Sequence, residues 1–256
     1  MNSTLVRNLL VRGMLAGLAA GVFALAVAYF LGEPLVDRAI GFEEAHAPAH
    51  GHEAELVSRG LQSTAGLATG VLLYGVAFGG IAALAYCFAL GRVGRFSPRA
   101  TALLLSGGAL LAVYVVPFLK YPANPPAVGD PDTIGRRTTL YFLMMLLGVL
   151  LAIAATLLGK RLARGLGTWW ATVAAVAAFV LAIGLAYAFL PAVDEVPAGF
   201  PATVLWRFRL CALAVQTTLW SGFGLLFGEL AERLPTPGPA TSTAPARPVA
   251  APRRPA

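Results

Sequence analysis

Six long runs of uncharged, mostly apolar residues alternate with polar segments along the chain. The runs cover residues 13–32, 64–90, 100–119, 140–158, 169–190 and 210–228. A helix rises 1.5 Å per residue, so about 20 residues span the roughly 30 Å hydrocarbon core of a bilayer. Inside lipid the backbone must satisfy its own hydrogen bonds, which a helix does within one segment. The pattern therefore predicts an all-α polytopic membrane protein with six transmembrane helices.

Glycines recur at every fourth residue in the first two runs, which places them on one face of a helix. The first run carries Gly13, Gly17 and Gly21. The second carries two further small-residue pairs, Gly66/Gly70 and Gly75/Gly79. Such stripes let helices pack closely in a membrane, so we expect close helix contacts at these positions.

The first run has a competing interpretation as a cleaved signal peptide. Arg7 and Arg12 give it a basic start, and the Ala-Val-Ala sequence at 26–28 resembles a cleavage site. An apolar signal region is usually 7–15 residues long, however, and this run is longer. A retained helix is therefore favoured.

Proline and glycine interrupt the centre of the chain at 117–138, where no continuous helix is expected. This segment and the polar segments 33–62 and 191–209 are predicted to be loops on one side of the membrane. The two shorter links, around 92–99 and 160–164, are basic. With the termini, they hold twelve basic and two acidic residues, a net charge of +10, against −3 on the other side. The positive-inside rule then places both termini in the cytoplasm.

Paired in order, the six helices form three helical hairpins. Each hairpin shows the same weak pattern: Phe-Leu before a proline at the end of its first helix, an acidic pair in its loop, and arginine before its second helix. Loop chemistry alone would give the same pattern. Residues 1–234 form the predicted transmembrane domain. Residues 235–256 are rich in proline and are predicted to be a disordered cytoplasmic tail.

Composition supports a membrane protein over other classes. Hydrophobic residues make up 58% and charged residues 12% of the chain, whereas soluble domains carry about 25% charge. The formal charge of +7 sits mostly beside apolar runs, so lipid, and no nucleic acid, is the expected partner. Cys87 and Cys211 form no C-x-x-C pattern and are expected to be free thiols near opposite membrane faces.

All three histidines fall in the first polar segment. His46, His50 and His52 lie close to Glu43 and Glu44. Imidazole nitrogen and carboxylate oxygen suit first-row divalent ions such as Co²⁺, Ni²⁺ and Zn²⁺. The segment is therefore a candidate for weak, exposed metal capture. A solvated acidic loop without a ligand is the alternative that the spacing leaves open.

Acidic pairs on the outer side could line a cation entrance, or they could be neutralised by nearby arginines. Glu33/Asp37, at the mouth of the first run, is the pair for which a metal role is favoured, and Asp130/Asp132 is a candidate on the pathway. For Asp194/Glu195 an ordinary salt bridge is favoured. The runs themselves hold no ionisable Asp, Glu, Lys, Arg or His, which pumps usually carry. Gln216 is the best pathway candidate within them.

Known catalytic and cofactor patterns are missing from the sequence. No histidine lies in an apolar run to hold a haem, and there is no nucleotide-binding G-x-x-x-x-G-K-[ST]. H-E-x-x-H and G-x-S-x-G are also absent. We therefore predict that the protein is not an enzyme and holds no permanent cofactor. A membrane enzyme has only the polar loop 124–137 in its favour.

Residues 116–138, which read VPFLKYPANPPAVGDPDTIGRRT, resemble the signature loop of the CbtA family, a bacterial family of proposed cobalt transporter subunits. Four further stretches support the resemblance, which covers all but the tail: GEPLVDRAI at 32–40, ELVSRGLQST at 55–64, FSPR at 96–99 and LPAVDEVPAGFPATVLWRFRL at 190–210.

The resemblance implies a multi-pass protein of the bacterial inner membrane that serves in Co²⁺ uptake. It also implies a small partner, CbtB, with one span and a histidine-rich end, and a link to cobalamin supply. A scaffold or metal-sensing subunit without transport is the alternative, motivated by the lack of ionisable groups in the runs.

Overall fold

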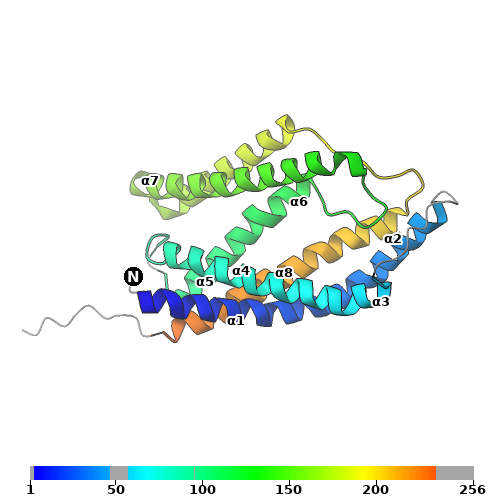
Figure 1. The fold of residues 1–256 in the computed structure, drawn as a ribbon. Helices are drawn as coiled ribbons and strands as arrows, with labels where there is room; N and C mark the ends of the chain where they lie inside the picture. The colour runs from blue at the N-terminus through cyan, green and yellow to red at the C-terminus, as the bar shows by residue number, and fades with distance from the viewer. Residues whose placement is uncertain (1–2, 47–56, 95, 235–256) are drawn as a thin grey trace, which may run out of the picture.

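The computed structural model describes residues 3–46, 57–94 and 96–234, and every regular element in these ranges is a helix (Figure 1). Five of these helices are long and apolar enough to cross a membrane. The predicted all-α class is confirmed, and the helices fit a membrane protein. The predicted disordered tail, 235–256, lies outside the described residues.

The first two long helices each contain a π-helical turn. The first consists of α1 (Ser3–Val27), the π turn η1 (Ala28–Gly32) and α2 (Glu33–His46). The second consists of α3 (Arg59–Leu61), the π turn η2 (Gln62–Gly66) and α4 (Leu67–Ala89). Isolated π turns are rare and are frequent at functional sites, so the ends of these two helices that carry Glu33 and Arg59 are candidates for a functional site.

The third long helix also contains a π turn, and two further long helices follow it. The third long helix consists of α5 (Pro98–Ala109), the π turn η3 (Leu110–Val115) and α6 (Val116–Lys120). A 3₁₀ turn, η4 (Pro131–Thr133), leads into α7 (Ile134–Phe189), and α8 (Ala202–Glu232) ends the described chain. Ser97 caps α5 by accepting a hydrogen bond from the Ala100 amide at 3.2 Å.

The predicted glycine stripe is confirmed in the contact between α1 and α4, which lie side by side with α8 (Figure 1). A Cβ atom on Gly17 would lie 2.1 Å from the Gly75 carbonyl oxygen, and one on Gly79 would lie 2.2 Å from that of Gly13. Only glycine permits this approach. The predicted packing role of Gly70 is wrong, because no atom lies within 4 Å of a Cβ placed there.

The long helix α7 changes direction at Gly167, where φ is 73° and ψ is 165°. Figure 1 shows its two halves running antiparallel above the other helices. This hairpin packs against η3 and α6. α8 packs instead against α1 and α5, so among the described residues the third predicted pair, 169–190 with 210–228, is not a packed hairpin.

Several predicted loop boundaries are wrong. The segment 33–62 begins with helix α2. The basic link 160–164 is helical because lysine and arginine are good helix formers, and the helix is interrupted only at Gly167. The segment 191–209 ends in helix α8, which starts after Pro201. The central loop is shorter than predicted and spans only 121–130 before η4.

Pro117 lies inside the third long helix without ending it, because the backbone directly before it is in the π turn η3 and not in regular α-helix. The π turn η3 directly before it widens the helix at the same point. The two cysteines are free, as predicted.

Candidate functional site

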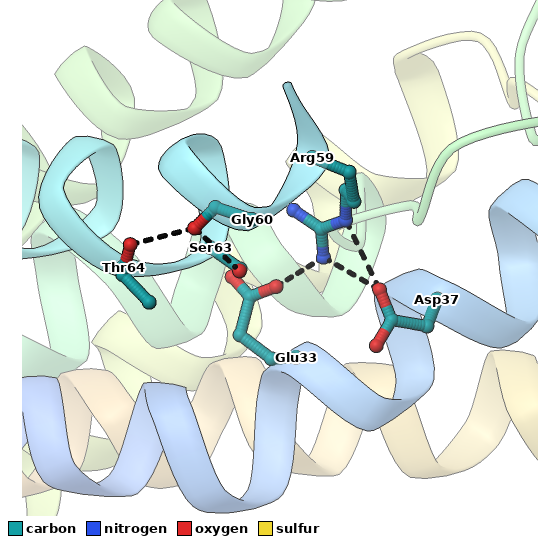
Figure 2. Close-up of polar contacts among 6 residues, drawn as sticks. All are labelled: Glu33, Asp37, Arg59, Gly60, Ser63 and Thr64. Atoms are coloured by element: carbon teal, nitrogen blue, oxygen red, sulfur yellow. Dashed lines mark hydrogen bonds and ion pairs between the residues drawn. The ribbon is translucent and has the colours of Figure 1, made fainter. Parts of the chain in front are cut away.

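Glu33 and Asp37 lie one turn apart at the start of α2, directly after the π turn η1. Arg59, the first residue of α3, contacts both (Figure 2). Its Nη2 atom pairs with Glu33 Oε2, and its Nε atom donates to Asp37 Oδ1 at 3.0 Å. Two carboxylates facing one guanidinium leave the cluster one negative charge in excess.

The same cluster is rich in oxygen atoms. The Gly60 carbonyl accepts hydrogen bonds from the hydroxyls of Ser63 and Thr64, at 3.2 and 2.6 Å (Figure 2). The Glu33 side chain is 14% exposed and that of Asp37 is 61% exposed. The site is therefore open to solvent on the Asp37 side and closed on the Glu33 side.

His46 is exposed at the end of α2. Its Nδ1 atom lies 2.8 Å from the Phe42 carbonyl oxygen, and its ring stacks on Phe42 with centroids 4.1 Å apart. A carbonyl accepts only, so Nδ1 donates to it, and in the neutral ring the lone pair then lies on Nε2. This is the arrangement that orients metal-binding histidines.

The other predicted ligands are dispersed. Glu43 and Glu44 are exposed on α2, and His50 and His52 lie outside the described residues. His46 follows Asp37 by nine residues, about 13 Å along a helix, so one ion cannot contact both. Within 3–46, 57–94 and 96–234, no group of three His, Cys, Asp or Glu side chains is arranged to hold a metal ion.

A second polar site joins the central loop to the loop before α8. Asp130 accepts a hydrogen bond from the Asp132 amide at 2.9 Å and so caps η4, while its own amide donates to Glu195 at 3.0 Å. Glu195 also forms an ion pair with Arg137 at 3.2 Å. The Thr133 hydroxyl, the Asp130 amide and the arginines lower the pKa of Glu195.

This second site surrounds a cavity of about 330 Å³. Arg209 lies in its wall and donates to Asn124 Oδ1 at 3.0 Å. Its Nε atom is buried and has no hydrogen-bond partner in the part of the chain that the structure describes. The Tyr121 hydroxyl, also in the wall, donates to the Pro191 carbonyl at 2.9 Å. Asp130 and Glu195 thus serve first to hold the two loops together.

Gln216 lies in α8 within the apolar interior. Its Oε1 atom accepts a hydrogen bond from Trp220 at 3.2 Å, and its side chain also bonds to Tyr74 of α4. This contact joins a phenol of α4 to an amide of α8.

A comparison with known families decides the class of protein. The family model described as "Probable cobalt transporter subunit (CbtA)" matches residues 6–232, nearly the whole chain. The chain belongs to the CbtA family. No match is found among curated proteins or among solved structures.

Membership of the CbtA family makes this a multi-pass membrane protein and a subunit of a cobalt transporter, with cobalt as its substrate. The family is described as a transporter subunit rather than as an enzyme. The matched residues include both polar sites and every long apolar helix.

Sequence reasoning missed four residues that hold these sites in the CbtA-family chain. The sequence offers Arg59, Arg137 and Arg209 as arginines that precede apolar runs and that could neutralise acidic residues, and it does not single out Tyr141. The signal for the arginines is that each stands one to five residues before an apolar run. Their partners could not be read from the sequence, since Arg137 pairs with Glu195 of another loop.

Proposed function

We propose that this CbtA-family chain is the multi-pass subunit of a Co²⁺ uptake system in the bacterial inner membrane. The family match over residues 6–232 carries the proposal. The Glu33–Asp37–Arg59 cluster at the outer end of the first apolar helix supports it. Residues 1–234 act as one transmembrane domain, and 235–256 form a cytoplasmic tail.

Six crossings with both termini in the cytoplasm fit this role. The two halves of α7, residues 134–166 and 168–189 on either side of Gly167, are each longer than the roughly 20 residues that a crossing requires. The bend then lies beside the basic residues of 160–164, on the side that holds most of the positive charge. The polar sites around Glu33 and Glu195 face outward.

Capture begins at the exposed end of α2, where His46 offers its Nε2 lone pair beside Glu43 and Glu44, with His50 and His52 farther along the chain. The ion then reaches Glu33 and Asp37. There Arg59 acts as a resident cation, and a divalent ion replaces it because two carboxylates hold a double charge better than a single one. Imidazole and carboxylate ligands suit Co²⁺ among first-row ions.

Passage through the membrane follows the polar groups that line up between the helices. Gln216 and the hydroxyl groups near it offer oxygen ligands between the helices. Asp130 and Asp132 contribute negative potential at the outer mouth. A small single-span CbtB-like partner supplies further metal ligands.

Vesicles containing the purified full chain, with and without the small partner, test the proposal. Internal Co²⁺ is followed with a metal-quenched dye. The variant E33Q/D37N should lower uptake about tenfold at low Co²⁺ and much less at saturating Co²⁺. E229Q is the matched control, because Glu229 also pairs with arginines, Arg99 and Arg233, at the other end of the bundle. Unchanged uptake in the double variant would remove the carboxylates from the mechanism, and vesicles without any uptake would contradict transport.

The proposed displacement of Arg59 from Glu33 and Asp37 by Co²⁺ can be tested separately. R59Q should raise the affinity for Co²⁺ several-fold, since the competing cation is lost, while R59K should stay close to wild type. Replacing His46, His50 and His52 together should weaken uptake at low metal only. A loss of affinity in R59Q would contradict the exchange.

The second candidate function is a scaffold or metal-sensing subunit without transport. The lack of ionisable groups within the apolar runs favours it. It predicts Co²⁺ binding to the reconstituted protein without flux, with or without the partner. The vesicle experiment separates the two functions directly.

A further inference from the structure

A groove runs between the first long helix and α8 at the end where α2 begins. It encloses about 430 Å³. Its apolar wall consists of Phe30, Leu31, Pro34, Leu35, Leu210, Cys211 and Ala214, and two arginines, Arg38 and Arg207, complete the lining. A groove that combines a long apolar wall with two cations accommodates an amphipathic ligand.

The two arginines lie at the same end of this groove. α2 and α8 pack against each other, and Figure 1 shows the far end of α2 beside the start of α8. Arg38 comes one turn after Pro34, whereas Arg207 comes one turn before Cys211. The groove is thus cationic at its outer end and apolar toward the membrane interior.

Neither guanidinium is neutralised within the described ranges, where Arg38 and Arg207 are exposed and enter no ion pair or hydrogen bond. The nearest carboxylates in sequence are already engaged, because Asp37 pairs with Arg59 and Glu195 pairs with Arg137. The outer end of the groove therefore keeps its positive charge.

One exposed aromatic residue, Trp206, lies at the cationic end of the groove, and two more, Tyr29 and Phe30, lie about 12 Å farther toward the interior along the first long helix. Trp206, next to Arg207, is 63% exposed, and Phe30 is 71% exposed. Tyr29 is 44% exposed. Aromatic side chains gather at the boundary between hydrocarbon and headgroups, which places the arginines at the depth of lipid phosphates.

We propose that this groove binds one anionic phospholipid, with its phosphate on Arg38 and Arg207 and an acyl chain along the apolar wall. Guanidinium groups bind phosphate oxygens in a bidentate manner. A free phosphate ion would gain nothing from the apolar wall, and a zwitterionic lipid would gain less from the charges. The site stands apart from Co²⁺ transport and does not depend on it.

Native mass spectrometry of the purified full chain in detergent tests this site. Dioleoyl phosphatidylglycerol and dioleoyl phosphatidylcholine are titrated separately. The wild type should retain one phosphatidylglycerol with a preference of about tenfold or more over phosphatidylcholine. A basic residue near a membrane contributes about 1 kcal/mol, or roughly fivefold, so R38Q and R207Q should each weaken phosphatidylglycerol binding about fivefold and the double variant about thirtyfold.

The matched control is R136Q. Arg136 is exposed at the outer end of α7 and does not line the groove, so its replacement should leave the affinity unchanged. A214W fills the apolar wall while keeping both arginines, and it should also abolish retention. Helical content and elution volume verify that each variant is folded.

Three results would overturn the proposal: equal retention of both lipids by the wild type, an unchanged affinity in the double variant, or competition by millimolar inorganic phosphate as effective as that of lipid. If a protein helix occupied the groove instead, the wild type would carry no lipid, and the mass of its assembly would fall when A214W is introduced. That result would equally overturn it.

Discussion

The α1–α4–α8 bundle and the α7 hairpin are both apolar, yet they are held in different ways. In the bundle, backbone touches backbone through Gly13, Gly17, Gly75 and Gly79. In α7, only 11% of the most apolar stretch is buried, against 28–33% in the other long helices. Lipid removes the hydrophobic drive for helices to associate, so close packing of small residues is what makes the bundle rigid.

The hairpin is attached mainly along one edge. The Lys120 ammonium donates to the Tyr187 carbonyl at 2.9 Å, and the Tyr187 hydroxyl donates to the Val116 carbonyl. One close backbone approach exists, because a Cβ on Gly148 would lie 2.5 Å from the Ala112 carbonyl. The comparison teaches that hydrogen bonds and one glycine position this element, while most of its apolar surface remains available to lipid or to another subunit.

The largest effect is expected for Gly17 in the bundle. In G17A the new methyl group would collide with the Gly75 carbonyl, and overpacking of this kind should lower the free energy of unfolding by about 3 kcal/mol. The control G184A adds a methyl group to α7 where no atom lies within 4 Å. It should raise stability by up to about 1 kcal/mol. Unfolding in detergent with added SDS measures both, and equal effects would refute the comparison.

A smaller, local effect is expected for Gly148. G148A should push the hairpin away from η3 at a cost of about 2 kcal/mol. Hydrogen exchange should rise in 134–189 and stay constant in α1 and α4. Increased exchange throughout the molecule would mean that hairpin and bundle unfold together.

The bend of the hairpin depends on Gly167. Its φ of 73° disfavours any residue with a Cβ, so G167A should cost about 1–2 kcal/mol. Thermal denaturation followed by circular dichroism measures this, with G165A as the neighbouring control at an ordinary helical φ. An unchanged thermal stability in G167A would show that the turn can relax without glycine.

The close packing of the bundle could be predicted from the sequence. The spacing of Gly13, Gly17 and Gly21 predicted a close helix contact, which the structure forms with α4, and the prolines around 122–126 predicted a break in the helix. The boundaries could not be predicted, because polar residues such as those of α2 continue a helix beyond the apolar run. The third predicted hairpin failed because packing of α8 on α1 and α5 is a tertiary property.

For the same reason, only part of the candidate site could be predicted from the sequence. Glu33 and Asp37 could be named, since acidic residues at the mouth of an apolar run are conspicuous. For this pair the sequence favours a metal role over neutralisation by a nearby arginine, and the structure pairs both carboxylates with Arg59 across 22 and 26 residues of sequence. Arg137 might have been matched with nearby Asp130 or Asp132, but the fold pairs it with Glu195.

The smallest expected effect concerns the loops that lead into the hairpin and α8. Hydrogen bonds from Thr133 and Asp130, with the charge of Arg137, lower the pKa of Glu195 below its ordinary value of 4.5. A carboxyl whose pKa falls on folding contributes stability above its unfolded pKa and loses that contribution as the pH falls through its folded pKa. Exchange of the amides in 121–133, corrected for intrinsic rates, should therefore rise below about pH 4.5 in the wild type. E195Q should show raised exchange already at neutral pH and little further change on acidification. E44Q, at an exposed position of α2, should follow the wild type, and an E195Q profile that also follows it would show that Glu195 does not clamp the two loops.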